Sequence, residues 1–254
     1  MNNTIHPIIA DFLKYLKNVR FFSDHTIRAY RYDLRNYYSF CINFDTENDF
    51  IHLDQTAIQL YLQGLTKKGL SAKTLARRLA TIKSFYKYML IKDLVKVNIA
   101  RFVKTPKIKR ELPHYLSLQE AKDIIQLPIG DNEKALRERL ILELFYATGI
   151  RISELIKINI NDIRLEEGII YILGKGNKER IVIIGNEAKQ VLCDYLNIRR
   201  KKKCGDLNYL FPALRSGKFG TKGTISSRTV FNIVKKYLKI VSDDEKLSPH
   251  SLRH

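Results

Sequence analysis

Three segments of this 254-residue chain gather side chains that could act on a phosphate group. ATGIRISELIKI carries Arg151, GKGNKER carries Lys175, and LSPHSLRH carries His250 and Arg253. A guanidinium group can bind two phosphate oxygens at once, and an imidazole can transfer a proton near neutral pH. The three segments are therefore candidates for chemistry on an anionic substrate.

Each segment taken alone also has a purely structural explanation. Arg151 and Glu154 have the three-residue spacing of an ion pair on a helix surface. The loop around Lys175 could be a tight turn, and it lacks the spacing of a nucleotide-binding phosphate loop. His250 and Arg253 could form an exposed pair on a helix that begins with a proline.

The charge of the chain indicates a partner that is a polyanion. It has 45 Lys and Arg against 26 Asp and Glu, a formal net charge of +19. The net charge is +12 in residues 1–110 and +7 in the remainder, so the excess is not confined to a tail. This distribution favours nucleic acid over a membrane surface, because a surface-binding helix would concentrate its charge.

Other features place the chain among cytoplasmic proteins without a membrane segment. The three cysteines form no disulfide framework and lack metal-ligand spacing. No apolar run approaches the roughly 20 residues of a membrane span, and the N-terminal segment does not resemble a signal peptide.

Hydrophobic periodicity predicts four helices in the first hundred residues, which together form a small bundle. We expect these helices at about 7–19, from Ser23 onwards, at 54–67 and after Ser71. Ser23 is followed three residues later by Thr26, which matches only half of a capping box. On the fourth helix, basic residues share the polar side.

Two prolines, Pro106 and Pro113, punctuate the basic segment RFVKTPKIKRELPHYLS. Proline disfavours helix at and before its own position, so we expect this segment to be extended, with a basic linker at 105–113.

The remaining residues predict a second, mostly helical domain with one small antiparallel element. A capping box at Ser117 and Glu120 begins this part. The expected elements are helices at 133–148, 186–201 and 228–241 and a hairpin of strands at 169–173 and 180–184.

Taken together, the three segments resemble motifs of the tyrosine recombinase (lambda integrase-like) family, and within it the bacterial XerC and XerD group. T-G-x-R-x-S-E-L is similar to the first arginine box, GKGNKER to the hairpin that carries a lysine, and LSPHSLRH to the H-x-x-R box. The pattern S-x-x-T-x-x-x-Y-x-x-D-L at Ser23–Leu34 is similar to the core-binding domain. The resemblance therefore covers nearly the whole chain.

The resemblance implies a mainly α fold in two domains. Residues 1–104 would be a four-helix, SAM-like core-binding domain that binds DNA, and residues 105–113 would be the linker. Residues 114–254 would be the catalytic domain, mostly helical with a small antiparallel sheet and incomplete at its C-terminus.

The resemblance also implies a role for each candidate catalytic residue. Arg151 and Arg253 would bind the non-bridging oxygens of the scissile phosphate, and His250 would donate a hydrogen bond to the same phosphate. Lys175 would protonate the leaving 5′ oxygen, with Lys178 of the same loop as the alternative. No metal and no nucleotide cofactor is implied.

Five further residues have other expected roles or none. Glu154 is expected to orient neighbouring arginines, and His254 matches no position of the family pattern. Arg77, Arg78 and Arg228 are candidates for reading bases.

The nucleophile is where the sequence departs from the family pattern. In the family a tyrosine lies a few tens of residues beyond the H-x-x-R box, whereas all 14 tyrosines of this chain precede it. The expectation is a fragment that does not form the covalent 3′-phosphotyrosyl intermediate by itself.

Two classes of function follow. The first is a site-specific recombinase that acts on double-stranded DNA as a homo- or heterotetramer with a second recombinase, in chromosome dimer resolution at cell division or as a phage or mobile-element integrase. The second is a non-catalytic truncation that binds recombination sites. A type IB topoisomerase shares the chemistry, but the N-terminal half does not fit it.

Overall fold

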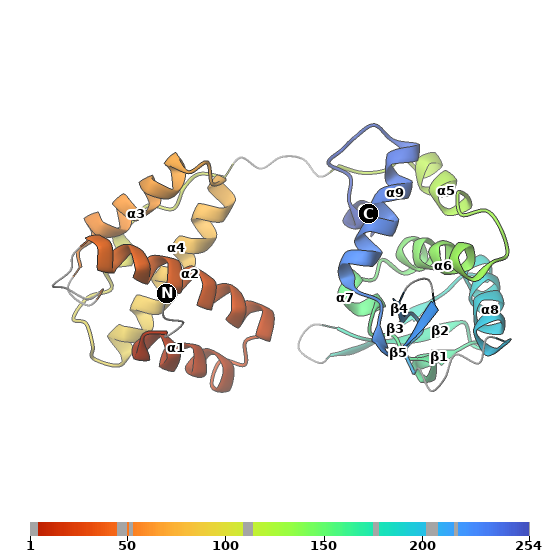
Figure 1. Cartoon of the computed structure of the whole chain (residues 1–254), viewed down its shortest axis with the longest axis horizontal. Helices are drawn as coiled ribbons and strands as arrows, with labels where there is room; N and C mark the ends of the chain where they lie inside the picture. The colour runs from red at the N-terminus through yellow and green to blue at the C-terminus, as the bar shows by residue number, and fades with distance from the viewer. Residues whose placement is uncertain are drawn as a thin grey trace. The chain divides into compact units, whose positions relative to one another are not determined.

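The computed structural model describes residues 5–44, 50, 53–108, 114–174, 178–201, 208–215 and 218–253. The chain divides into two compact units, Met1–Glu111 and Leu112–His254. Figure 1 shows helices in the first unit and helices around two small sheets in the second. The chain is thus mainly α, as the sequence predicted.

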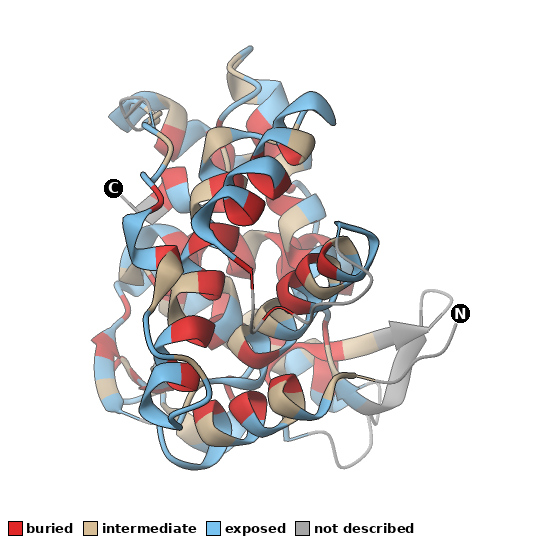
Figure 2. Cartoon of the chain, turned by 90° about the vertical axis from the view of Figure 1, so that its left-hand side faces the viewer, coloured by how far each residue is buried: buried red, intermediate tan, exposed pale blue. Residues whose placement is uncertain are grey.

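In the described residues of the first unit, the secondary structure consists of four α-helices and one 3-10 turn. The elements are α1 (Pro7–Asn18), α2 (Asp24–Phe44), α3 (Gln55–Lys67), α4 (Ala72–Ile91) and η1 (Ile99–Phe102). Each α-helix buries one apolar side in a common core that includes Phe12, Leu34, Ile58, Leu79 and Phe85. Figure 2 shows buried and exposed residues alternating around these helices, as expected for amphipathic helices on a shared core.

Serine followed three residues later by threonine begins three helices of the chain. At α2 the Ser23 hydroxyl accepts a hydrogen bond from the Thr26 backbone N–H at 3.3 Å, and the two hydroxyls lie 2.9 Å apart. Ser71 with Thr74 begins α4 in the same way, and a third such pair, Ser226 with Thr229, begins α9 (Ser227–Val241) of the second unit. Serine therefore caps the helix where the glutamate of a full capping box is missing.

A buried carboxylate joins α2 to α4. Asp33 is fully buried and pairs with Arg77, while the Thr81 hydroxyl donates to it at 3.2 Å. Arg78 is also buried, and its Nη1 donates to the Tyr61 hydroxyl at 3.1 Å. The prediction that Arg78 is available for reading bases is therefore wrong, because its guanidinium belongs to the interior of the bundle.

The extended segment predicted from Arg101 onwards begins later than expected. Arg101 and Phe102 belong to the 3-10 turn η1, and the residues on either side of these two, Ala100 and Val103, are buried in the core of the first unit. Burial of these two apolar side chains outweighs the local preference for an extended chain. Residues 109–113 of the predicted linker lie outside the described residues.

The second unit contains helices and two antiparallel sheets. Its helical elements are α5 (Leu118–Gln126), α6 (Glu133–Thr148), α7 (Ile152–Leu155), η2 (Ile160–Asp162), α8 (Asn186–Lys201), α9 (Ser227–Val241) and η3 (Pro249–Arg253). The strands are β1 (Ile163–Arg164), β2 (Ile169–Leu173), β3 (Glu179–Ile183), β4 (Pro212–Arg215) and β5 (Lys218–Thr224).

The predicted hairpin forms β2 and β3, with β1 added at the other edge of β2. Ile169 pairs with Ile183 and Leu173 with Glu179, so the second strand starts one residue earlier than predicted. The two-stranded sheet of β4 and β5 was not predicted. The expectation of one small antiparallel element is therefore wrong.

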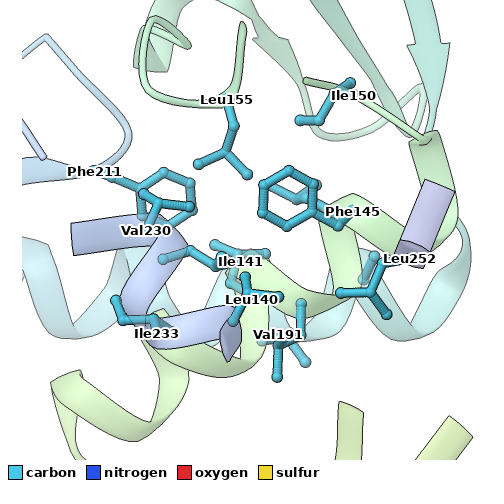
Figure 3. Packing of buried hydrophobic residues seen from close by; sticks show 14 of the residues in the cluster. Leu140, Ile141, Phe145, Ile150, Leu155, Val191, Phe211, Val230, Ile233 and Leu252 are labelled. Atoms are coloured by element: carbon cyan, nitrogen blue, oxygen red, sulfur yellow. The ribbon is translucent and has the colours of Figure 1, made fainter. Parts of the chain in front are cut away.

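The core of the second unit surrounds α6. Leu140, Ile141 and Phe145 of this helix are completely buried, and they pack with residues of α7, α8, α9 and η3 (Figure 3). In Figure 3 Ile150, Phe145 and Leu252 lie on the same side of the cluster. The segments around Arg151 and His250 are thus anchored in the same core.

Candidate active site

Arg151 follows a sharp turn at the end of α6. Gly149 adopts the left-handed conformation, with φ of 56°, and its N–H donates to the Phe145 carbonyl oxygen at 3.0 Å. The next residue, Ile150, is completely buried, which fixes the direction of the chain. Arg151 then caps α7 and leaves 52% of its side chain exposed. Buried Ile150 therefore anchors the chain directly before Arg151, whose guanidinium lies at the surface.

Glu154 collects hydrogen bonds from two arginines. Its side chain is 4% exposed. The carboxylate accepts from the Arg151 backbone N–H at 2.8 Å, from Arg151 Nη1 at 2.9 Å, and from Arg180 Nη1 and Nη2 at 3.0 and 2.9 Å. Glu154 thus contacts the neighbouring arginine expected from the sequence and a second one 26 residues further along the chain.

These contacts determine the ionisation of Glu154. Burial by itself would raise the pKa of the carboxyl group. The hydrogen bonds from Arg180 and from the backbone and side chain of Arg151 outweigh burial and lower the pKa to about 2. Glu154 is therefore ionised at neutral pH.

The lowered pKa of Glu154 gives a prediction for stability. A carboxylate whose pKa is about 2 in the folded protein and has its ordinary value of 4.5 in the unfolded chain stabilises the fold by up to about 3 kcal/mol. This contribution is fully present above pH 4.5 and is lost as the pH falls towards 2. We expect Glu154→Gln to lower the free energy of unfolding at pH 7 and to have less than about half that effect at pH 3.

Urea unfolding of both proteins at the two pH values measures this difference. Exchanging exposed Glu166 for glutamine is the matched control, and we expect a change in the free energy of unfolding below about 0.5 kcal/mol there. An equal loss of stability at pH 7 and pH 3 for Glu154→Gln would contradict the electrostatic explanation.

The loop between β2 and β3 is closed by a backbone hydrogen bond, in which Gly174 N–H donates to the Lys178 carbonyl oxygen at 2.8 Å. A Cβ atom at Gly174 would lie 3.2 Å from that oxygen and 3.4 Å from Arg180 Nη1. Lys178 is exposed, and the predicted catalytic residue Lys175 lies outside the described residues. Gly174, at the start of this loop, therefore lies close to the Arg180–Glu154 pair.

His250 and the backbone of Arg253 belong to η3, which is a short 3-10 helix that packs against α6 and α9. The neighbouring Ser251 and Leu252 are buried, whereas His250 is exposed. The Ser251 hydroxyl accepts from the Ser248 N–H at 3.2 Å, which fixes the start of the turn. The side chain of Arg253 lies outside the described part of the chain.

Arg180 is the residue of this site that sequence reasoning missed. The sequence predicts a strand at this position, and in β3 the Arg180 side chain lies on the same side as buried Val182. Side chains alternate between the two faces of a strand, so a charged residue in phase with the buried positions needs an opposite charge. That alternation was the available signal.

The two remaining candidates for reading bases, Arg77 and Arg228, are exposed to solvent. Arg77 leaves 47% of its side chain exposed while it pairs with Asp33. Arg228 is exposed in the first turn of α9, with its guanidinium carbon 5.8 Å from the centre of the Phe231 ring.

The described residues contain no group of three or more His, Cys, Asp and Glu side chains arranged to hold a metal ion. Within the same ranges, no helix combines the length and apolar character needed to cross a membrane.

Comparison with known proteins gives matches to both units. Residues 114–254 match the model of the phage integrase family, and residues 9–92 match the model of the phage integrase N-terminal SAM-like domain. The chain is similar to tyrosine recombinase XerC of Thermodesulfovibrio yellowstonii, with 39% identity over 97% of the chain and 80% of the relative. It is also similar to tyrosine recombinase XerD of Staphylococcus haemolyticus, with 34% identity over 98% of the chain and 83% of the relative.

Among solved structures, the chain is similar to a lambda integrase dimer bound to a COC′ core site. The TM-score is 0.71 at 19% identity, over 98% of this chain and 87% of the solved one. At this identity the match shows the fold alone.

Proposed function

Since the chain belongs to the phage integrase family of tyrosine recombinases, we propose that it binds a specific double-stranded DNA site and supplies the groups that activate one phosphodiester there for cleavage and rejoining. The arrangement at Arg151 carries this proposal. An exposed guanidinium, held at its base by a buried carboxylate, suits the binding of non-bridging phosphate oxygens.

The four residues of the candidate site have distinct roles. Arg151 and Arg253 stabilise the charge that develops on the phosphate in the transition state. His250 donates a hydrogen bond to the same phosphate and assists proton transfer. Lys175 protonates the 5′ oxygen as its bond to phosphorus breaks. No step of this scheme uses a metal ion or a nucleotide, because the bond energy stays in the protein–DNA linkage.

The nucleophile of the reaction is a tyrosine hydroxyl that attacks phosphorus and becomes linked to the 3′ phosphate, releasing a 5′ hydroxyl. We place it outside these 254 residues. Two observations support this: every tyrosine precedes the H-x-x-R segment, and Tyr237, the one nearest to it in sequence, donates its hydroxyl to Glu138 at 2.5 Å and is 5% exposed. By this proposal the chain of 254 residues binds DNA without cleaving it.

Residues 1–104 are the DNA-binding domain of this proposal and residues 114–254 are its catalytic domain, with the linker between them. The similarity to both XerC and XerD proteins favours chromosome dimer resolution at cell division over phage or mobile-element integration. Four protomers, identical or shared with a second recombinase, would then act on two DNA sites in the cytoplasm.

The test uses the complete gene product and this chain side by side. Selection from a random duplex library gives the bound sequence, and copies of that duplex then carry a 5′-bridging phosphorothiolate at successive positions. Sulfur in the bridging position traps the covalent intermediate, because the released thiol attacks it poorly. We expect the complete product to form a covalent adduct at one position of each strand and the 254-residue chain to bind without an adduct.

The outcomes separate the two classes of function. Specific binding without an adduct in the complete product would support a non-catalytic DNA-binding protein. An adduct formed by the 254-residue chain itself would contradict the placement of the nucleophile.

A further inference from the structure

The cluster around Glu154 has one more positive charge than negative. Arg151 and Arg180 both donate to the same buried carboxylate. The hydrogen bond to Glu154 also raises the pKa of Arg180, so its guanidinium stays charged. One carboxylate can neutralise only one of the two cations.

The geometry indicates which cation is neutralised. Arg180 approaches Glu154 in the bidentate arrangement, with Nη1 on one carboxylate oxygen and Nη2 on the other. The guanidinium of Arg151 makes its contact to Glu154 through Nη1 alone, and 52% of that side chain is exposed against 37% of Arg180. Arg180 is thus the closer partner of the carboxylate, and Arg151 is the one that faces solvent.

We propose that Arg180 is a positioning residue that neutralises Glu154, so that the charge of Arg151 remains available to the scissile phosphate. This inference rests on the proposed role of Arg151. Without Arg180, the buried carboxylate would have Arg151 as its remaining guanidinium partner among the described contacts. The resulting pair would have no net charge, and its attraction for a phosphate would fall accordingly.

A merely structural role would have a different signature. Removing one partner of a buried ion pair also destabilises a fold, because it leaves the other charge unpaired. Loss of stability therefore does not distinguish the two explanations. A double change that removes the charges of both Arg180 and Glu154 does distinguish them. It leaves the charge of Arg151 unneutralised again, while the ion pair stays absent.

The experiment compares variants of the complete gene product in single-turnover cleavage of the selected duplex. The scissile position carries either the natural phosphate or a methylphosphonate, in which a methyl group replaces one non-bridging oxygen and removes the negative charge. A variant that lacks only cationic stabilisation of the phosphate is expected to lose less of its cleavage rate on the uncharged methylphosphonate than on the natural phosphate. A misfolded enzyme loses equally on both.

We expect Arg180→Gln to slow cleavage of the phosphate substrate about tenfold to 100-fold, and that of the methylphosphonate less than about threefold. Arg180→Lys keeps the charge and should retain most of the rate. The double variant Arg180→Gln with Glu154→Gln should recover at least part of the loss. The matched control is Arg164→Gln in β1, because Arg164 is an exposed arginine of the same sheet that donates to the Asn161 carbonyl oxygen instead.

Each result supports or overturns the inference. Equal losses on both substrates, or a double variant slower than Arg180→Gln alone, would show that Arg180 acts through the fold and would overturn it. A rate for Arg180→Gln equal to that of Arg164→Gln would also overturn it. Arg151→Ala in the same assay tests the premise: if that variant cleaves normally, the proposed function of Arg151 fails, whereas a slow Arg151→Ala beside a normal Arg180→Gln rejects only this inference.

Discussion

Replacing Arg151 by alanine is expected to slow DNA-strand cleavage by the complete gene product about 100-fold to 1,000-fold, the usual effect of removing one positioned donor to a developing oxyanion. The physical reason is that Arg151 contributes mainly when charge accumulates on the phosphate in the transition state. Accumulation of the covalent adduct on the phosphorothiolate duplex over time measures the rate. Arg151→Lys should recover little, because an ammonium group lacks the planar fork of donors.

Binding should change far less than cleavage. Fluorescence anisotropy with the selected duplex measures affinity, and we expect Arg151→Ala and the control Arg164→Ala to bind within a few-fold of each other. Arg164 suits the comparison because it is an exposed arginine of the same unit. Its guanidinium carbon lies 5.6 Å from the centre of the Tyr171 ring, and its described hydrogen bonds go to backbone carbonyl oxygens and not to Glu154. Normal cleavage by Arg151→Ala would reject the assigned role.

The largest loss of stability is expected from Phe145→Ala, at about 3–5 kcal/mol. Phe145 is completely buried in the core of the second unit, and its carbonyl oxygen accepts the hydrogen bond that ends α6 at Gly149. Truncation of the ring removes apolar burial and leaves a cavity beneath the turn that leads to Arg151. Urea unfolding followed by circular dichroism measures the change.

Phe102→Ala is the matched control for this prediction. The same ring is removed there, but Phe102 is 62% exposed, so we expect a change below about 1 kcal/mol. Similar losses for the two variants would show that the packing around Phe145 does not support the second unit as described.

The boundaries of several helices could be predicted because local signals determine them. The predicted helices at 133–148 and 186–201 match α6 and α8, and α6 ends where Gly149 takes up the left-handed conformation. Serine caps marked the starts of α2 and α4 in the same way. Residues within one turn of each other satisfy the free N–H and C=O groups of a helix end, so a short stretch of sequence is sufficient.

The family could also be inferred from sequence, because its recognition depends on the order and spacing of short segments. The domain matches and the Xer relatives confirm that resemblance. Part of the candidate site could be predicted because it is local: Arg151 and Glu154 are three residues apart and contact each other.

Tertiary structure alone decided the features that depend on distant partners. Arg180 reaches Glu154 across 26 residues, and Arg77 reaches Asp33 across 44. The strands β4 and β5, with the sequences PALR and KFGTKGT, lack the regular alternation that marks a strand. Sequence determined where several of the helices begin and end, since these boundaries follow from neighbours along the chain. Which charges neutralise each other in the interior follows from packing between segments far apart in sequence, and no local pattern encodes it.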